Sequence, residues 1–289
     1  NAFSAALAGV SVYRNLLELP PVAALRSLFR TLERGEGEAA LEAYSAAFYA
    51  LAQAGYDSFC TYLTDQLRYS SSPYAEAVAR RQATDRLTQA ARRDVAVFAA
   101  LADLDPAELK EALLPLLAED WREPARLLPQ WNRGALPSFE TLTEFYRVHG
   151  CGLFSRYHAF VWQDGGLHPV PHPDFVPEDA FLGYERQRSQ VIENTRLLVA
   201  GQQVNNVLLY GDAGTGKSST VKAIANEFAP DGLRLIEVKK NQLYQIPALM
   251  DELAKNPLKF ILFIDDLSFA SNDDNFAALK AILEGGVGG

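Results

Sequence analysis

Residues 205–228 limit the folds open to this chain more than any other part of its sequence. An apolar run at 207–210 leads into a glycine-rich turn at 211–218, and a helix-forming stretch follows. The turn fits the pattern G-x4-G-K-[ST] of a phosphate-binding loop. Its glycines let successive backbone N–H groups face one point, and a helix beginning near Gly216 adds the positive end of its dipole. The sequence therefore predicts a strand, a phosphate-binding loop and a helix, in this order.

The residue types in this loop indicate a nucleoside triphosphate, and we expect ATP with Mg²⁺. Lys217 is expected to reach the terminal phosphates, and the Ser218 hydroxyl is expected to bind Mg²⁺. A glycine-rich turn without a ligand is the alternative, but such a turn needs no Lys-Ser pair after its last glycine. The expected nucleotide-binding residues of the loop are Gly211, Asp212, Ala213, Gly214, Thr215, Gly216, Lys217, Ser218 and Ser219.

A second motif lies downstream, where the apolar residues 260–264 are followed by Asp265 and Asp266. This pattern predicts a buried parallel strand that ends in carboxylates. Ligands of parallel α/β sheets sit at the carboxyl ends of the strands, so both aspartates are expected at the same edge as the phosphate loop. Asp265 is expected to hold Mg²⁺ and Asp266 to orient the attacking water. A helix cap or a solvated turn is the alternative interpretation.

Together the two motifs resemble the Walker A and Walker B motifs of the AAA+ branch of P-loop ATPases. Most members carry glutamate as the second acid, where this chain has Asp266, and the form Asp265-Asp266-Leu267 resembles helicase-loader-type AAA+ proteins. The stretch 183–286 is similar to a bacterial family of predicted AAA+ ATPases of unassigned cellular role. The resemblance implies that Gly183 and Tyr184 pack on the adenine, and that the protein forms a homo-oligomer, a hexamer.

The resemblance also implies the sheet order 5-1-4-3-2, in which a fourth strand separates the phosphate-loop strand from the Asp265 strand. The sequence ends at Gly289, before a fourth strand. We therefore expect an α/β P-loop NTPase domain that is truncated after its third strand, and we expect the printed sequence to be an incomplete functional unit. Sensor, arginine-finger and lid residues are not assigned.

Composition sets further limits. A chain of 289 residues suggests about two domains, and the net charge of −9 argues against a uniformly basic nucleic-acid surface but leaves room for a local patch. Cys60 and Cys151 have no paired spacing, which is typical of a reduced, cytoplasmic protein. No apolar stretch reaches the length that spans a bilayer, so no membrane partner is expected.

We expect three segments: a helical domain at 1–150, a hairpin and Pro-rich linker at 151–178, and the AAA+ nucleotide-binding domain at 179–289. Ala, Leu, Glu and Arg dominate the first segment, and glycine and proline fall between its helical stretches. Its longest predicted helix carries an arginine-rich face, made of Arg80, Arg81, Arg86, Arg92 and Arg93 with Glu76, Asp85 and Asp94 interleaved. We interpret this face either as a nucleic-acid contact or, preferably, as a salt-bridged surface. The predicted helices are 3–18, 21–34, 37–54, 56–70, 73–102, 106–119 and 138–148.

The expected function is hydrolysis of ATP to ADP and phosphate, used to remodel or switch an unknown protein or DNA partner. Lys217 and Asp266 are the expected catalytic residues, and Ser218 and Asp265 the metal ligands. Two alternatives stay open. One is a nucleotide-gated protein-binding module with negligible turnover, and the other is a helicase-loader-like ATPase associated with DNA.

Overall fold

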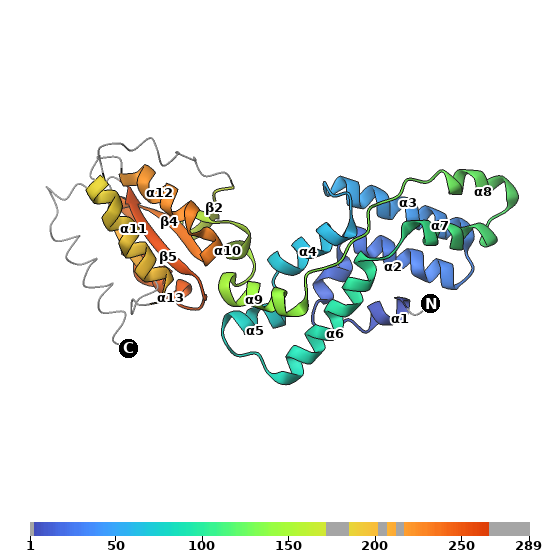
Figure 1. The fold of residues 1–289 in the computed structure, drawn as a ribbon, viewed down its shortest axis with the longest axis horizontal. Helices are drawn as coiled ribbons and strands as arrows, with labels where there is room; N and C mark the ends of the chain where they lie inside the picture. Colours follow the sequence, from blue (N-terminus) through green and yellow to red (C-terminus); the bar gives the residue numbers. More distant parts are fainter. Residues whose placement is uncertain (1–2, 172–184, 202–206, 212–216, 266–289) are drawn as a thin grey trace. The chain divides into compact units, whose positions relative to one another are not determined.

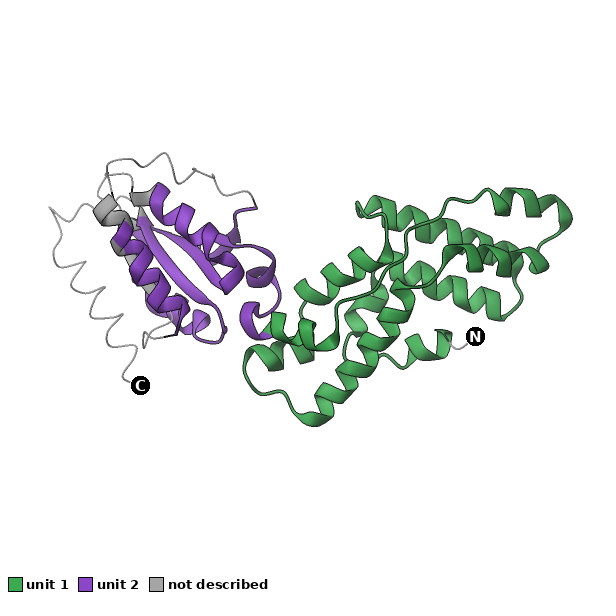
Figure 2. Cartoon of the chain, in the orientation of Figure 1, with its two compact units in different colours: residues 1–146 green, residues 147–289 purple. Residues whose placement is uncertain are grey.

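The computed structural model describes residues 3–171, 185–201, 207–211 and 217–265. The chain forms two compact units, unit 1 at Asn1–Tyr146 and unit 2 at Arg147–Gly289 (Figure 2). The described residues of unit 1 are helical, and those of unit 2 form a mixed, open sheet with flanking helices (Figure 1). The predicted succession of a helical part and an α/β part is therefore confirmed.

Unit 1 is held together by leucine, tyrosine and phenylalanine side chains that recur at helical spacing and are buried, among them Leu16, Leu25, Tyr44 and Phe98. Glycines with positive φ, Gly35 and Gly55, follow the ends of two helices, where a left-handed residue is needed. The elements are α1 (Phe3–Ala8), η1 (Arg14–Glu18), α2 (Pro20–Glu33), α3 (Gly37–Gln53), α4 (Phe59–Tyr69), α5 (Pro73–Ala79), α6 (Asp85–Ala102), α7 (Pro106–Leu113), η2 (Leu114–Leu116), α8 (Glu119–Arg126) and α9 (Phe139–His149).

The predicted single helix at 73–102 is wrong, because the chain forms α5 and α6 with a break between them. Arg81 has φ +57, and the N–H groups of Arg81 and Gln82 donate to the carbonyls of Val78 and Ala77, which closes the end of α5. The Thr84 hydroxyl accepts from the Leu87 N–H and begins α6. Local capping thus overrides the continuous helical composition of this stretch.

The predicted helix at 3–18 is also interrupted, and a buried carboxylate accounts for the interruption. Asp94 of α6 is 2% exposed, and its carboxylate accepts from the backbone N–H groups of Ser11, Val12 and Tyr13 at 2.7–3.2 Å. Three successive N–H groups that point at one anion cannot also continue a helix. Asp94 therefore belongs to the core of unit 1 rather than to the charged surface that the sequence suggested.

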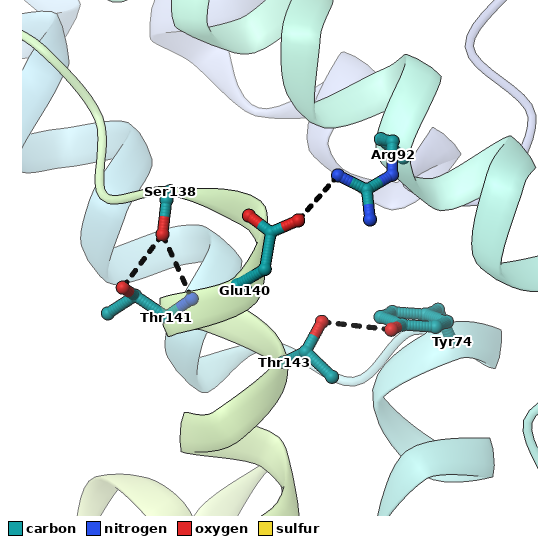
Figure 3. A network of polar contacts seen from close by, with 6 residues as sticks. All are labelled: Tyr74, Arg92, Ser138, Glu140, Thr141 and Thr143. Atoms are coloured by element: carbon teal, nitrogen blue, oxygen red, sulfur yellow. Dashed lines mark hydrogen bonds and ion pairs between the residues drawn. The ribbon is translucent and has the colours of Figure 1, made fainter.

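The arginine-rich face of α6 meets the start of α9 (Figure 3). The Arg92 guanidinium donates to Glu140 at 2.6 Å and lies over the Phe139 ring, 4.6 Å from its centroid. Beside it, Ser138 caps α9 by accepting from the Thr141 N–H. The hydrogen bond from Arg92 holds the pKa of the Glu140 carboxyl below its ordinary value. For Arg92, this favours the salt-bridged surface over the nucleic-acid contact.

Unit 2 is a five-stranded sheet with the order β2-β1-β4-β5-β3 among the described residues. The three strands β4, β5 and β3 run parallel, and β1 is parallel to β4 and antiparallel to β2. The elements are α10 (Leu153–Arg156), β1 (Ala159–Gln163), β2 (Gly166–Pro169), α11 (Glu185–Val199), β3 (Val207–Gly211), α12 (Lys217–Glu227), η4 (Ala229–Asp231), β4 (Leu233–Lys239), η5 (Lys240–Gln245), α13 (Ile246–Leu253) and β5 (Lys259–Asp265).

Side chains alternate between the two faces of this sheet, and each face has its own core. On β5, Phe260 and Leu262 pack with α13, whereas Ile261 and Phe263 pack with α11 and α12. Both faces of the parallel strands are covered, which explains why these strands read as continuous apolar runs. The strand predicted over the apolar residues 260–264 is confirmed, and β5 extends one residue further at either end.

The predicted hairpin is β1–β2, joined by the two-residue turn Asp164-Gly165. Both turn residues have positive φ, +54 and +74, which suits the twist of paired strands. The hairpin does not stand apart as part of a linker, because β1 pairs with β4 along residues 159–162. It extends the sheet beyond β4.

The described strands β4, β5 and β3 lie side by side in this order, which is the implied order 5-1-4-3-2 read from its other end without the fourth and fifth strands. β3 and β5 pair directly, with Gly211 beside Ile264, and no strand of the described residues separates them. The fourth strand that the resemblance places between them was not expected within this sequence, so its position stays a prediction. Both strands are apolar and need partners for their backbone groups, and direct pairing satisfies these groups.

Candidate functional site

The strands that carry the two sequence motifs, β3 and β5, end at the same edge of the sheet. β3 ends at Gly211 and β5 ends at Asp265, which lies one residue beyond the register partner of Gly211. Adjacent strands are about 4.8 Å apart, so the backbones at these two ends are close neighbours. α12 begins at Lys217, six residues after the end of β3 in the sequence. The predicted order of strand, turn and helix is confirmed in the residues that flank the turn.

The expected site residues fall into two groups. Gly211 ends β3, Asp265 ends β5, and Lys217, Ser218 and Ser219 form the first turn of α12. The others lie outside the described residues: Gly183, Tyr184, Asp212, Ala213, Gly214, Thr215, Gly216 and Asp266.

Helix α12 is fixed to the sheet by its apolar face. Val221, Ile224 and Ala225 are buried in the core that covers one face of β4 and β5. The first turn of α12 contains no acidic residue, so the positive end of its dipole is not neutralised from within the helix. An anion near the N-terminus of α12 would be stabilised there.

The segment η5 follows β4 at this edge of the sheet, and its attachment could not be predicted from the sequence. The Trp162 indole N–H donates to the Gln245 side-chain oxygen at 2.6 Å, and the Gln245 amide donates to the Tyr244 hydroxyl at 3.1 Å. With the oxygen and nitrogen of its side-chain amide exchanged, Gln242 donates to the Trp162 carbonyl and accepts from the Asp164 N–H. These contacts attach η5 to the end of β1.

A buried arginine holds the opposite end of β4. Arg234 is fully buried, and its guanidinium donates to the carbonyls of Phe154, Ala229 and Leu233 at 2.6–3.0 Å. It also bonds to Nδ1 of His149 at 3.0 Å, a contact that requires the ring nitrogen to be an acceptor. Burial, Arg234 and His158 lower the pKa of His149 to about 4. Burial and Arg234 likewise lower the pKa of His158. The single arginine within the apolar run 233–238 was the available sequence signal for this anchor.

Acidification is expected to destabilise unit 2 between pH 6.5 and about pH 4. In this window the unfolded chain, with a His149 pKa of 6.5, binds more protons than the folded chain, whose His149 pKa is about 4. The contribution of His149 is complete above pH 6.5 and is lost as the pH falls. Because the ring is only half-buried, solvent screening reduces the effect to about 1–2 kcal/mol.

Urea unfolding at pH 7 and pH 4.5 measures this effect in the wild type and in His149→Gln. Glutamine keeps an acceptor for Arg234 but does not titrate, so the variant is expected to lose less stability on acidification. Equal losses in both proteins would show that His149 does not contribute.

No group of three His, Cys, Asp or Glu side chains suited to a metal lies within the described ranges. The side chains of Ser218 and Asp265, the expected Mg²⁺ ligands, are not among those described. The Nε2 of His168 lies 3.1 Å from the Gln163 carbonyl within the hairpin.

The helices in the described parts of the chain are too short or too polar to cross a lipid bilayer.

Comparison with known proteins gives one match. A search of curated proteins and a search of solved structures found no similar protein. Residues 155–289 match the model of a family described as "Protein of unknown function (DUF815)". The matched region contains both motif segments, 211–218 and 265–266, and begins after the helical unit 1.

Proposed function

We propose that unit 2 binds ATP together with Mg²⁺ and hydrolyses it to ADP and phosphate. One observation carries this proposal: Gly211 and Asp265 end adjacent parallel strands at the same edge, and α12 begins at Lys217. A phosphate-binding loop and a metal-binding carboxylate must lie at the same edge of a sheet, because the carboxylate would hold the Mg²⁺ that accompanies the bound phosphates. We infer an AAA+ type of P-loop fold from the motifs, and the order β4-β5-β3 of the described strands supports it.

The strand and helix ends fit the roles expected of the residues. Lys217, the first residue of α12, would bind the terminal phosphate oxygens as a cation. The Ser218 hydroxyl and the Asp265 carboxylate are oxygen donors of the kind that Mg²⁺ prefers. When bound there, Mg²⁺ would neutralise charge that develops on the transferred phosphoryl group.

Asp266 would orient the attacking water and accept its proton as the new phosphorus–oxygen bond forms and the bond to ADP breaks. Aspartate is one methylene shorter than the glutamate of most AAA+ proteins. This shorter reach favours slow turnover and supports a second candidate, a switch that binds ATP to capture a protein partner. The helical unit 1 would supply the partner-binding surface in either case.

We also infer that the protein works in the cytoplasm as a homo-oligomer, for which the AAA+ resemblance implies a hexamer. Cys60 and Cys151 form no disulfide in the described structure, which suits a reducing compartment. Association with DNA, as in helicase loaders, is less favoured because the chain carries a net charge of −9.

Phosphate release from ATP, measured with and without DNA, tests the proposal, with Lys217→Ala as the blank. Turnover above the blank supports an ATPase, and stimulation by DNA would favour the loader-like function. ATP binding without turnover would favour the nucleotide-gated switch. Absence of both binding and turnover would refute the proposed function.

A further inference from the structure

We propose that Lys239, the last residue of β4, contacts the terminal phosphate of the bound nucleotide and lets the site distinguish ATP from ADP. This inference rests on the proposed function, and it assigns a role to a residue that belongs to neither motif. It starts from the strand register. Lys239 lies beside Asp265, and the preceding pair is Val238 and Ile264.

Strand alternation places Lys239 on the side of the sheet that α12 covers. Leu233 and Leu235 of β4 lie in the core beneath α11 and α12. Alternate residues of a strand face the same side of the sheet, so Lys239 faces the same side as these two leucines. Ile261 and Phe263 of β5 lie in that same core, and position 265 is the next one along β5 on their side of the sheet. Lys239 and Asp265 are thus neighbouring positions at the carboxyl edge, on the side from which α12 begins.

The charge and exposure of Lys239 suit a ligand contact. The residue is exposed, and no hydrogen bond or ion pair to its ammonium group occurs among the described side chains. An exposed lysine at a strand end is usually only solvated. Here, however, the residue lies one strand from Asp265 and two strands from Gly211. A strand spacing is about 4.8 Å, and a flexible four-carbon stem can bring the ammonium group toward a phosphate held between those ends.

Within β4, Glu237 is the acidic residue on the same side as Lys239. It lies two positions before Lys239, is partly buried, and forms no ion pair with any described residue. The positions of β4 on this side, 233, 235, 237 and 239, therefore carry no net charge and do not by themselves form a cationic patch. A contact by Lys239 would therefore depend on a phosphate delivered by the loop and α12, as the terminal phosphate of ATP would be.

The test compares the affinities for adenylyl imidodiphosphate, which keeps a third phosphate but resists hydrolysis, and for ADP, both with Mg²⁺. In Lys239→Gln we expect the affinity for the analogue to fall about tenfold, the effect of one charge-assisted hydrogen bond. The affinity for ADP should change less than about twofold, and Lys239→Arg should restore most of the lost affinity because it restores the cation.

Lys255→Gln is the matched control, because Lys255 is an exposed lysine between α13 and β5, at the other edge of the sheet. It should bind both nucleotides like the wild type. Equal losses for the analogue and ADP in Lys239→Gln would overturn the inference, since they would indicate a general effect on the site. So would unchanged affinity for both. A wild-type protein that binds neither nucleotide would instead refute the proposed function itself, and the inference with it.

Discussion

Replacing Lys217 with alanine is expected to lower the affinity for ATP by at least about a hundredfold and to abolish turnover. Lys217 is the first residue of α12 and carries the invariable cation of the G-x4-G-K-[ST] pattern. It would make charge-assisted hydrogen bonds to terminal phosphate oxygens, each worth about 1.5–3 kcal/mol. Titration calorimetry with ATP and Mg²⁺ measures the loss directly.

Lys222→Ala is the control for this prediction, because Lys222 is a partly buried lysine on the same helix, more than one turn further along. It removes the same charge from α12 without removing a group from the loop, so nearly wild-type affinity is expected. Unchanged affinity in Lys217→Ala, or equal losses in the two variants, would contradict the assignment of residues 211–218 as a phosphate-binding loop.

Replacing Asp94 with alanine is expected to lower the free energy of unfolding by about 3 kcal/mol. The change removes a buried carboxylate that accepts from the N–H groups of Ser11, Val12 and Tyr13. Leaving buried donors without an acceptor costs about 1–3 kcal/mol each, and such costs are not additive. For a unit of this size the loss corresponds to roughly 6–12 °C in Tm.

Urea unfolding followed by far-UV circular dichroism measures this loss, since most of the helical signal comes from unit 1. Gln89→Ala on the same helix is the control, because Gln89 is exposed and its side chain forms no hydrogen bond with the described residues. It should change stability by less than about 0.5 kcal/mol. A loss below about 1 kcal/mol in Asp94→Ala would show that the 11–13 segment finds other acceptors.

The elements around the two motifs could be predicted from local sequence. Apolar runs that end in glycine or aspartate predicted β3 and β5 within one residue, because both faces of a parallel sheet must be apolar. The start of α12 followed from the loop pattern alone. The position of the ends of β3 and β5 at one edge of the sheet could also be predicted, because ligands of parallel sheets bind at the carboxyl ends of the strands. The direct pairing of the two strands could not be predicted.

The helix breaks in unit 1 could not be predicted from helical composition. The interruption at residues 9–13 depends on Asp94, which is about eighty residues away in the sequence. The break after α5 depends on Arg81 in a left-handed conformation, which non-glycine residues adopt rarely. Thr84, a good N-cap residue, was the local signal that the prediction passed over.

The strand order depends on long-range pairing, which local patterns do not encode. The expected separation of β3 and β5 came from the AAA+ resemblance rather than from the residues themselves. The anchor at Arg234 and the edge position of Lys239 also emerged only from the sheet register and burial. These two residues lie at opposite ends of β4, one buried among carbonyl groups and one exposed beside Asp265.

The central claim is that the loop at 211–218 and Asp265 form one site for ATP and Mg²⁺. Titration of ATP with and without Mg²⁺, in the wild type and in Asp265→Asn, tests it most directly. The account predicts that Mg²⁺ strengthens ATP binding in the wild type and that Asp265→Asn loses most of this gain while still binding ATP without the metal. An affinity for ATP that changes neither with Mg²⁺ nor with the Asp265 substitution would contradict the claim.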